Sequence, residues 1–173
     1  VAESDIVIEA FEVTRSRIVV EAMIGGPSEL RLFALDGRPL GSVPNEPVAS
    51  VGIGARLDGD RLLFGSESYV TAQAWWLLDA GRDGAQPVKT ALSKPPTYAP
   101  GGRLADAEVR REFALSRDGA KVPVTIVQRR GTPRDGAQPV LLTGYGGYGV
   151  SIRPYFSRRM AFWLRHDGVL AVA

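Results

Sequence analysis

The sequence predicts two successive sheets of short antiparallel strands, followed by a segment in which strand, glycine-rich loop, helix and strand alternate. Three observations support this. Residues 5–92 contain two sets of four short runs rich in β-branched and apolar residues, separated by turn residues. Residues 93–107 are rich in proline and glycine, which is typical of a connection. From residue 108, the apolar spacing changes from that of strands to that of a helix and back.

Composition narrows the class of protein. The 173 residues are 45% hydrophobic and 23% charged, which is typical of a globular protein. Lys and Arg (21) nearly balance Asp and Glu (19) without any basic run, so we expect no nucleic-acid partner. The absence of cysteine excludes a disulfide framework and a thiolate nucleophile, and we expect neither metal nor cofactor. No apolar stretch reaches the roughly 18 residues of a membrane span. We therefore expect no membrane association and a cytoplasmic or periplasmic location.

Both ends of the sequence favour a longer polypeptide. Val1–Asp5 contains neither a methionine nor the features of a signal peptide, so we expect the chain to begin inside a longer protein or after processing. Gly168–Ala173 is a continuous apolar run, typical of a strand that is buried on both faces and needs neighbours. We therefore expect a cut at the C-terminus, and the remainder of the same polypeptide as a partner.

Residues 1–92 are predicted to form two four-stranded units. Asp36-Gly37 and Asp58-Gly59 are hairpin-type turns within them. Four strands in about 40 residues, repeated, is the spacing of β-propeller blades. A β-sandwich has similar strand spacing and is the alternative. The predicted strands are Ile6–Phe11, Arg17–Met23, Glu29–Leu35, Arg38–Val43, Ala49–Leu57, Arg61–Gly65, Ala72–Leu78 and Val88–Leu92.

Some residues of these units have simple structural interpretations. Asp58, Asp60 and Asp79 are expected to be turn residues. Side chains alternate along a strand, so Trp75 and Trp76 are expected to be one core and one surface aromatic.

Residues 93–107 are predicted to be an inter-domain linker, and residues 108–173 a different domain. Its helix is expected to have Pro154 in its first turn, an apolar face including Phe156, and Gly168 as its C-terminal cap. The remaining face residues are Met160, Trp163 and Leu164. The predicted strands are Val109–Leu115, Lys121–Arg129, Pro139–Thr143 and Val169–Ala173. The last two flank the helix, which predicts a parallel βαβ unit.

An antiparallel hairpin followed by a βαβ unit is typical of the opening of an α/β-hydrolase domain, here incomplete. The predicted fold is thus β-propeller blades followed by the beginning of that domain. In α/β-hydrolases the loop after the third strand contributes to the oxyanion hole, and Gly144–Gly149 occupies that place. Glycines such as Gly146 let the backbone approach a substrate. A tyrosine hydroxyl is a good donor to an oxyanion.

The loop has two other interpretations. Gly144, Gly146 and Gly149 formally match the Gly-x-Gly-x-x-Gly dinucleotide fingerprint. However, no helix opens at the last glycine and no acidic residue ends the next strand, which disfavours nucleotide binding. A purely structural glycine turn is the remaining interpretation.

Leu141–Ser157 and Trp163–Ala173 resemble the start of the peptidase domain of the prolyl oligopeptidase family. The shared features are a Gly-Tyr-Gly-Gly-aromatic loop, a Pro-x-Phe-Ser stretch and a strand ending in Ala-Val-Ala. Ser116–Val124 resembles the hairpin of that family. The resemblance implies a seven-bladed propeller upstream. It also implies a serine endopeptidase that cleaves short peptides on the carboxyl side of proline through an acyl-enzyme.

The same resemblance implies roles for three residues. Tyr145 would donate its hydroxyl to the oxyanion, Tyr148 would line the pocket for the residue before the scissile bond, and Gly146 would contact substrate. The family usually has Phe at the position of Tyr148. The Tyr resembles the oligopeptidase B branch, which cleaves after basic residues, whereas Gly147 favours the prolyl branch. Specificity for proline or for basic residues therefore stays open.

The catalytic triad is missing from this sequence. No Gly-x-Ser-x-Gly elbow occurs, and the single histidine, His166, is expected to be structural at a helix end. A triad needs all three groups, and the resemblance implies that they follow residue 173. Residues 1–173 alone are thus expected to be inactive and, with an open apolar strand edge, poorly soluble. An esterase and a non-catalytic binding module are the alternative functions.

Overall fold

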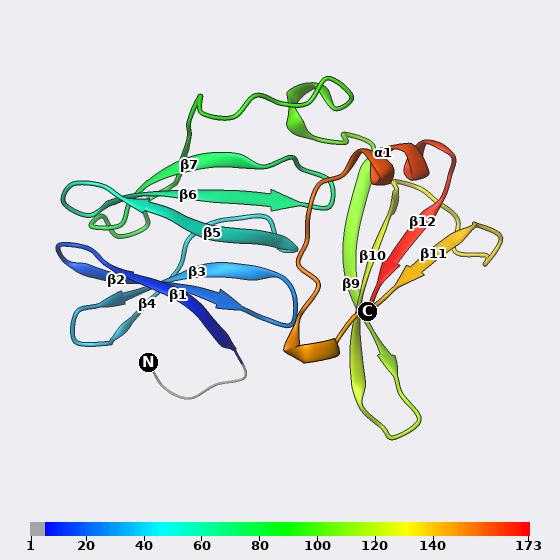
Figure 1. The fold of residues 1–173 in the computed structure, drawn as a ribbon, viewed down its shortest axis with the longest axis horizontal. Coiled ribbons are helices and arrows are strands. Elements are labelled where there is room, and N and C mark those ends of the chain that lie inside the picture. The colour runs from blue at the N-terminus through cyan, green and yellow to red at the C-terminus, as the bar shows by residue number, and fades with distance from the viewer. Residues whose placement is uncertain (1–5) are drawn as a thin grey trace.

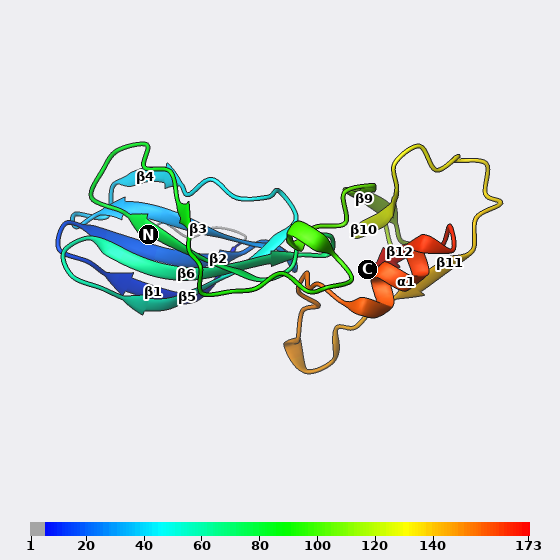
Figure 2. The same ribbon diagram turned by 90° about the horizontal axis from the view of Figure 1, so that it is seen from above.

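The computed structural model describes residues 6–173, so the first five residues, including the predicted chain start, lie outside the described range. Within that range the chain forms three four-stranded sheets and one α-helix. Figure 1 shows two of the sheets lying one above the other, while the third sheet and the helix lie beside their ends. Viewed from above, in Figure 2, the long loop of residues 130–139 projects from the third sheet.

The first two sheets each follow chain order, β1-β2-β3-β4 and β5-β6-β7-β8, with every neighbouring pair antiparallel. Such a meander is the arrangement of a propeller blade, whereas a sandwich usually has Greek-key connections. The eight predicted strands are present with small differences at their ends. The bounds are β1 Val7–Val13, β2 Arg17–Met23, β3 Ser28–Ala34, β4 Pro39–Ser42, β5 Ala49–Arg56, β6 Arg61–Ser68, β7 Ala74–Asp79 and β8 Val88–Lys89.

The last strand is shorter than predicted, because β8 ends at Lys89 rather than at Leu92. Thr90 binds the carbonyl of Trp75 twice, through its N–H at 2.9 Å and its hydroxyl at 2.8 Å. The chain then leaves the sheet in a turn.

The first and second sheets enclose one apolar core between them. Trp76 packs against this core, while Trp75 covers Gly54, where a Cβ would lie only 2.3 Å from the indole. The two side chains thus alternate as expected, with only Trp76 on this core, although both tryptophans are half-buried. The buried core residues are Val19, Leu30, Val43, Val51, Leu62, Phe64, Leu78 and Ala80.

Asp60 lies in the turn before β6, as predicted, and it also links the two sheets. Its Oδ1 accepts hydrogen bonds from Thr14 Oγ1 at 2.8 Å and from the Ser16 N–H at 2.6 Å. Burial by itself would raise the pKa of Asp60, but these hydrogen bonds and the nearby Arg17 charge outweigh it and lower the pKa. Asp58 lies in the turn before β6, as predicted, and pairs with Arg61. Asp79 was expected in a turn but is the last residue of β7, where it pairs with Arg82.

The third sheet has the order β11-β12-β10-β9. Its β9 and β10 form the predicted antiparallel hairpin, while β12 runs parallel to β11 and antiparallel to β10. The predicted parallel pair flanking a helix is therefore confirmed. The bounds are β9 Ala107–Leu115, β10 Lys121–Arg129, β11 Val140–Thr143, α1 Arg158–Arg165 and β12 Val169–Val172, with short 3-10 segments η1 Pro100–Gly102 and η2 Gly147–Gly149.

A second apolar core lies between α1 and the third sheet, and it includes residues from other parts of the chain. Tyr69 and Val70 enter it from the end of β6, and Ala99 and Leu104 from the predicted linker. The connection is therefore packed rather than free, and β9 already begins at Ala107, the last residue of the predicted linker. The other buried members are Ala107, Val127, Met160, Ala161, Leu164, Leu170 and Val172.

The helix begins later than predicted, since α1 starts at Arg158 with Ser157 as its N-cap. The Ser157 hydroxyl accepts from the Met160 N–H at 3.1 Å, a typical capping bond. Pro154 and Phe156 lie outside the helix because their backbone groups bind elsewhere. The Pro154 carbonyl accepts from Ser50 Oγ at 2.7 Å, and the Phe156 N–H donates to Glu67 at 3.0 Å.

The helix end also differs from the prediction. His166 is the C-cap, and Asp167, rather than Gly168, takes the left-handed conformation with φ 57°. The N–H groups of Asp167 and Gly168 bind the carbonyls of Leu164 and Trp163, both at 3.1 Å, which is a Schellman motif. Gly168 is needed for a different reason, because a Cβ there would lie 2.3 Å from the Trp163 indole.

Candidate active site at the junction of the sheets

The glycine-rich loop leaves the third sheet at the carboxyl ends of its two parallel strands. Thr143 and Val172, the last residues of β11 and β12, are register partners. The Ala173 N–H donates to the Thr143 carbonyl at 2.9 Å, which fixes where the loop starts. Ligands of α/β proteins bind outside the carboxyl ends of parallel strands, so the loop lies where a site is expected.

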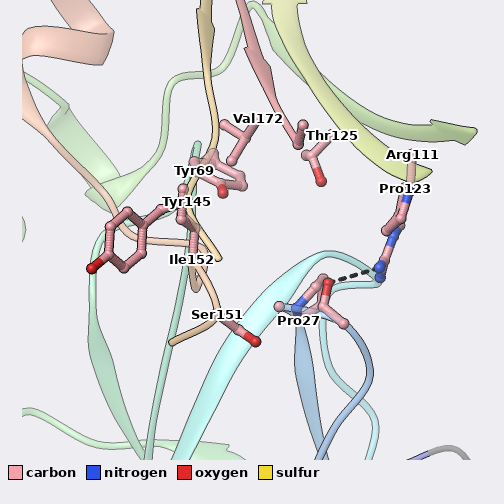
Figure 3. A pocket seen from close by; sticks show the side chains of 12 residues that line it. Pro27, Tyr69, Arg111, Pro123, Thr125, Tyr145, Ser151, Ile152 and Val172 are labelled. Carbon is pink, nitrogen blue, oxygen red and sulfur yellow. Dashed lines mark hydrogen bonds between the residues drawn. The ribbon is translucent and has the colours of Figure 1, made fainter. Parts of the chain in front are cut away.

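Tyr145 lies against the loop that carries it. A Cβ on Gly147 would lie 3.1 Å from Tyr145 Oη and 3.3 Å from Cζ, so the ring folds over that glycine. The residue is 54% exposed. In Figure 3 its hydroxyl points away from the side chains of Tyr69 and Thr125, although Tyr145 itself lines their cavity.

Tyr148 and Gly146 occupy open positions. Tyr148 takes the left-handed conformation, with φ 58°, and is 99% exposed. A Cβ on Gly146 would have no neighbour within 4 Å, so the backbone there is accessible from outside. Within the described residues, the structure brings Tyr145 to a cavity and leaves Tyr148 outside it.

The cavity beside Tyr145 has a volume of about 170 Å³ and is built from all three sheets. The turn between β2 and β3 forms one wall, Tyr69 at the end of β6 another, and residues of the third sheet and the loop the rest (Figure 3). The lining residues are Gly25, Gly26, Pro27, Tyr69, Arg111, Pro123, Thr125, Tyr145, Ser151, Ile152, Val172 and Ala173.

Sequence reasoning missed Tyr69 and Arg111, which are among the polar residues that line this cavity. Burial raises the pKa of Tyr69 to about 12, with the neighbouring Tyr155 adding to the rise and the Arg111 charge opposing it. Arg111 donates to the Ile24 and Gly25 carbonyls at 2.9 and 2.8 Å, which ties β9 to the first sheet. No local spacing marks either residue, because each contacts segments that are distant in sequence.

The remaining candidate groups lie elsewhere. His166 is exposed at the end of α1, with its ring 4.5 Å from that of Phe162. Among residues 6–173, no group of three or more histidine or acidic side chains is placed to hold a metal ion. No helix in the described part of the chain is long and apolar enough to cross a membrane.

The known proteins that resemble this chain in sequence or structure include several peptidases. No protein-family profile matches the chain. It is 40% identical to the prolyl endopeptidase of Elizabethkingia miricola over 60 residues, 35% of this chain and 8% of that protein. It is 30% identical to dipeptidyl aminopeptidase BI of Pseudoxanthomonas mexicana over 172 residues, 98% of this chain and 23% of that protein.

Two solved structures share the fold. A prolyl endopeptidase superposes with a TM-score of 0.77 at 24% identity, covering 98% of this chain and 24% of the other. Oligopeptidase B from Leishmania major gives a TM-score of 0.73 at 23% identity, with 98% and 24% covered. The chain therefore spans about a quarter or less of each of these proteins.

The chain is mostly β structure, and its first two sheets are meanders like propeller blades. The relatives that it matches are peptidases, and it corresponds to their propeller region. Within that class, the chain matches peptidases of the prolyl oligopeptidase family.

Proposed function

We propose that this chain is part of a serine endopeptidase that cleaves short peptides on the carboxyl side of proline. Under this proposal, residues 1–92 are two propeller blades, residues 93–107 the linker, and residues 108–173 the first part of an α/β-hydrolase domain. The observation that carries the proposal is the position of the Gly144–Gly149 loop. It follows β11, the third strand of its sheet in chain order, and precedes α1, the place of the oxyanion loop in α/β-hydrolases.

The position of Tyr145 and the accessible backbone at Gly146 support an oxyanion role for Tyr145. The residue lines a cavity at the carboxyl ends of β11 and β12, and rotation about its side-chain bonds can carry the hydroxyl from Gly147 toward a bound substrate. A donor that reaches the developing oxyanion stabilises the transition state by roughly 3 kcal/mol. The accessible backbone at Gly146 leaves room for a substrate beside the loop.

Tyr148 supports a second candidate specificity. The prolyl branch usually has Phe there, and Tyr is usual in the oligopeptidase B branch. The exposed Tyr148 side chain would line the specificity pocket once substrate and further residues surround it. We favour cleavage after proline because Gly147, against which the Tyr145 ring packs, matches that branch.

The proposal assigns the nucleophile, acid and base to residues outside this chain. No Gly-x-Ser-x-Gly occurs in the sequence. A triad needs three converging groups, whereas His166 is an exposed residue at the end of α1. Residues 1–173 by themselves should therefore not hydrolyse peptides, and their expected partners are short proline-containing peptides and the remaining polypeptide.

The test compares two chromogenic peptide substrates with the complete gene product. We expect kcat/KM to be at least about tenfold higher with proline than with arginine before the scissile bond, and a serine-directed covalent inhibitor to abolish both activities. A preference for arginine would support the oligopeptidase B specificity instead. Resistance to the inhibitor would contradict a serine mechanism, as would full activity of residues 1–173 alone.

A further inference from the structure

Residues 150–157, which we call the strap, join the glycine-rich loop to α1 without forming regular secondary structure. In Figure 1 this orange segment runs between the ends of the first two sheets and the third sheet. Its Pro154 is fully buried, so the strap is packed rather than free at the surface.

The strap is bound to the second sheet through two hydrogen bonds. Ser50 Oγ, on β5, donates to the Pro154 carbonyl at 2.7 Å. Glu67, on β6, accepts from the Phe156 N–H at 3.0 Å. These bonds satisfy backbone groups that would otherwise belong to an earlier helical turn, which is why α1 starts only at Arg158.

The strap is bound to the first sheet through Arg153. Its guanidinium bridges two carboxylates, Glu9 on β1 and Glu21 on β2, the latter at 3.4 Å. The strap also presses on the turn after β2, where a Cβ on Gly26 would lie 2.7 Å from the Ile152 carbonyl oxygen.

Glu21, one of the two carboxylates that bind Arg153, also contacts the second sheet. The residue is only 6% exposed, and its second carboxylate oxygen accepts from the Ile53 N–H of β5 at 3.2 Å. A buried carboxylate needs a partner for each oxygen, because the interior solvates charge poorly. Glu21 is therefore a junction at which the first sheet, the second sheet and the strap meet.

The strap is also the carboxyl-side anchor of the loop that bears Tyr145. The loop is fixed on one side by β11 at Thr143, and on the other side only three residues separate Gly149 from Arg153. At the end of the loop, the Val150 N–H donates a hydrogen bond to the Gly147 carbonyl at 3.1 Å. Because so few residues connect Arg153 to the loop, we expect a displacement of Arg153 to shift Gly147, on which the Tyr145 ring packs.

We propose that Arg153, held by Glu21, is a positioning residue that sets the placement of Tyr145. This inference rests on the proposed function, in which Tyr145 donates to the oxyanion. It makes the oxyanion donor depend on contact between the loop-bearing sheet and both antiparallel sheets. Without that contact, Arg153 would lose its two carboxylate partners and the loop one of its two anchors.

The test measures kcat and KM of the complete gene product, with Arg153→Gln made both in the native sequence and together with Tyr145→Phe. We expect Arg153→Gln alone to lower kcat about tenfold and leave KM within about twofold, since a misplaced donor affects mainly the transition state. With Tyr145→Phe present, the same change should lower kcat less than about twofold. Glu21→Gln should act in the same direction and add little to Arg153→Gln.

The matched control is Arg61→Gln, which removes an arginine–aspartate pair confined to the β5–β6 hairpin and should leave kcat unchanged. An equal loss of kcat from Arg153→Gln with and without Tyr145→Phe would overturn the proposal, because the arginine would then act independently of Tyr145. An unchanged kcat would overturn it as well. If Arg153→Gln does not fold, Arg153→Lys replaces it. The expected loss is smaller because lysine keeps the positive charge, but some loss remains because an ammonium lacks the planar fork of donors.

Hydrogen exchange tests whether Arg153 positions the loop, independently of whether Tyr145 donates to the oxyanion. In the Arg153→Gln protein, the amides of residues 146–150 should exchange faster, whatever reaction the protein catalyses. Unchanged exchange there would overturn the strap's role by itself. If Tyr145→Phe alone leaves kcat unchanged, the oxyanion role fails, and the exchange measurement still decides whether Arg153 positions the loop.

Discussion

Trp163 and Gly168 fit together at the end of α1. The indole N–H of Trp163 donates to the Val169 carbonyl at 2.9 Å, and the ring lies so close to Gly168 that a Cβ there would be 2.3 Å away. The helix end, the left-handed Asp167 and the start of β12 are thereby fixed in one unit. Since β12 lies at the centre of the third sheet, this contact helps to place the glycine-rich loop.

Gly168→Ala should therefore destabilise the protein. The added methyl group has no space beside Trp163, and overpacking of this kind costs about 1–3 kcal/mol. The measurement is thermal unfolding of the complete gene product. Gly52→Ala is the matched control, because its Cβ would meet its nearest atom, Glu21 Oε2, only at an ordinary 3.8 Å. Equal unfolding temperatures for the two variants would contradict the packing argument.

Asp60→Asn should weaken the contact between the first two sheets in a pH-dependent way. Loss of the charged acceptor for Thr14 and Ser16 should cost about 1 kcal/mol at neutral pH. The pKa of Asp60 is lowered in the folded protein, so its stabilising contribution is present above the unfolded pKa near 3.9 and disappears as pH falls through the folded pKa.

The measurement for Asp60 is the free energy of unfolding between pH 2 and 7. The gap between native protein and Asp60→Asn should be constant above about pH 5 and close progressively below about pH 4. Asp36→Asn, in the exposed β3–β4 turn, is the control, because its side chain accepts only from the nearby Arg38 N–H. A gap that persists at the lowest pH would show that the Asp60 charge is not responsible.

The isolated chain should self-associate through β11. This strand forms one edge of the third sheet, and its Val140, Leu141 and Leu142 are 59%, 54% and 69% exposed. Open apolar edges pair with other chains, and a lysine on such an edge opposes pairing. Sedimentation of residues 1–173 should show oligomers that Leu142→Lys reduces and that Leu92→Lys, outside any strand, leaves unchanged. A monomeric native chain that melts cooperatively would refute this expectation.

Much of the fold could be predicted from local patterns. Alternation and turn residues placed β2 and β10 at their observed bounds, and the remaining strands within a few residues. The start of α1 was missed because Phe156 continues the apolar spacing of a helix. In the folded protein, however, its N–H binds Glu67 and its ring stacks on Tyr98 at 5.8 Å. Contacts with residues that are distant in sequence cannot be predicted from the local pattern.

The candidate site could be predicted only in part, for the same reason. The glycines and Tyr145 are adjacent in sequence, so their pattern indicates a loop with a particular chemistry. Arg153 and Glu9 are 144 residues apart, and Glu21 resembles an ordinary charge within an apolar strand. Only the folded chain shows that these residues meet beside the loop.

The most direct test of the central claim is kcat for Tyr145→Phe in the complete gene product, measured with a proline-containing peptide substrate. If the hydroxyl donates to the oxyanion, kcat should fall about 100-fold while KM stays within about twofold. The phenyl ring can still pack over Gly147, so the unfolding temperature should not change. An unchanged kcat, with the variant fully folded, would contradict the assignment of this loop as the oxyanion loop.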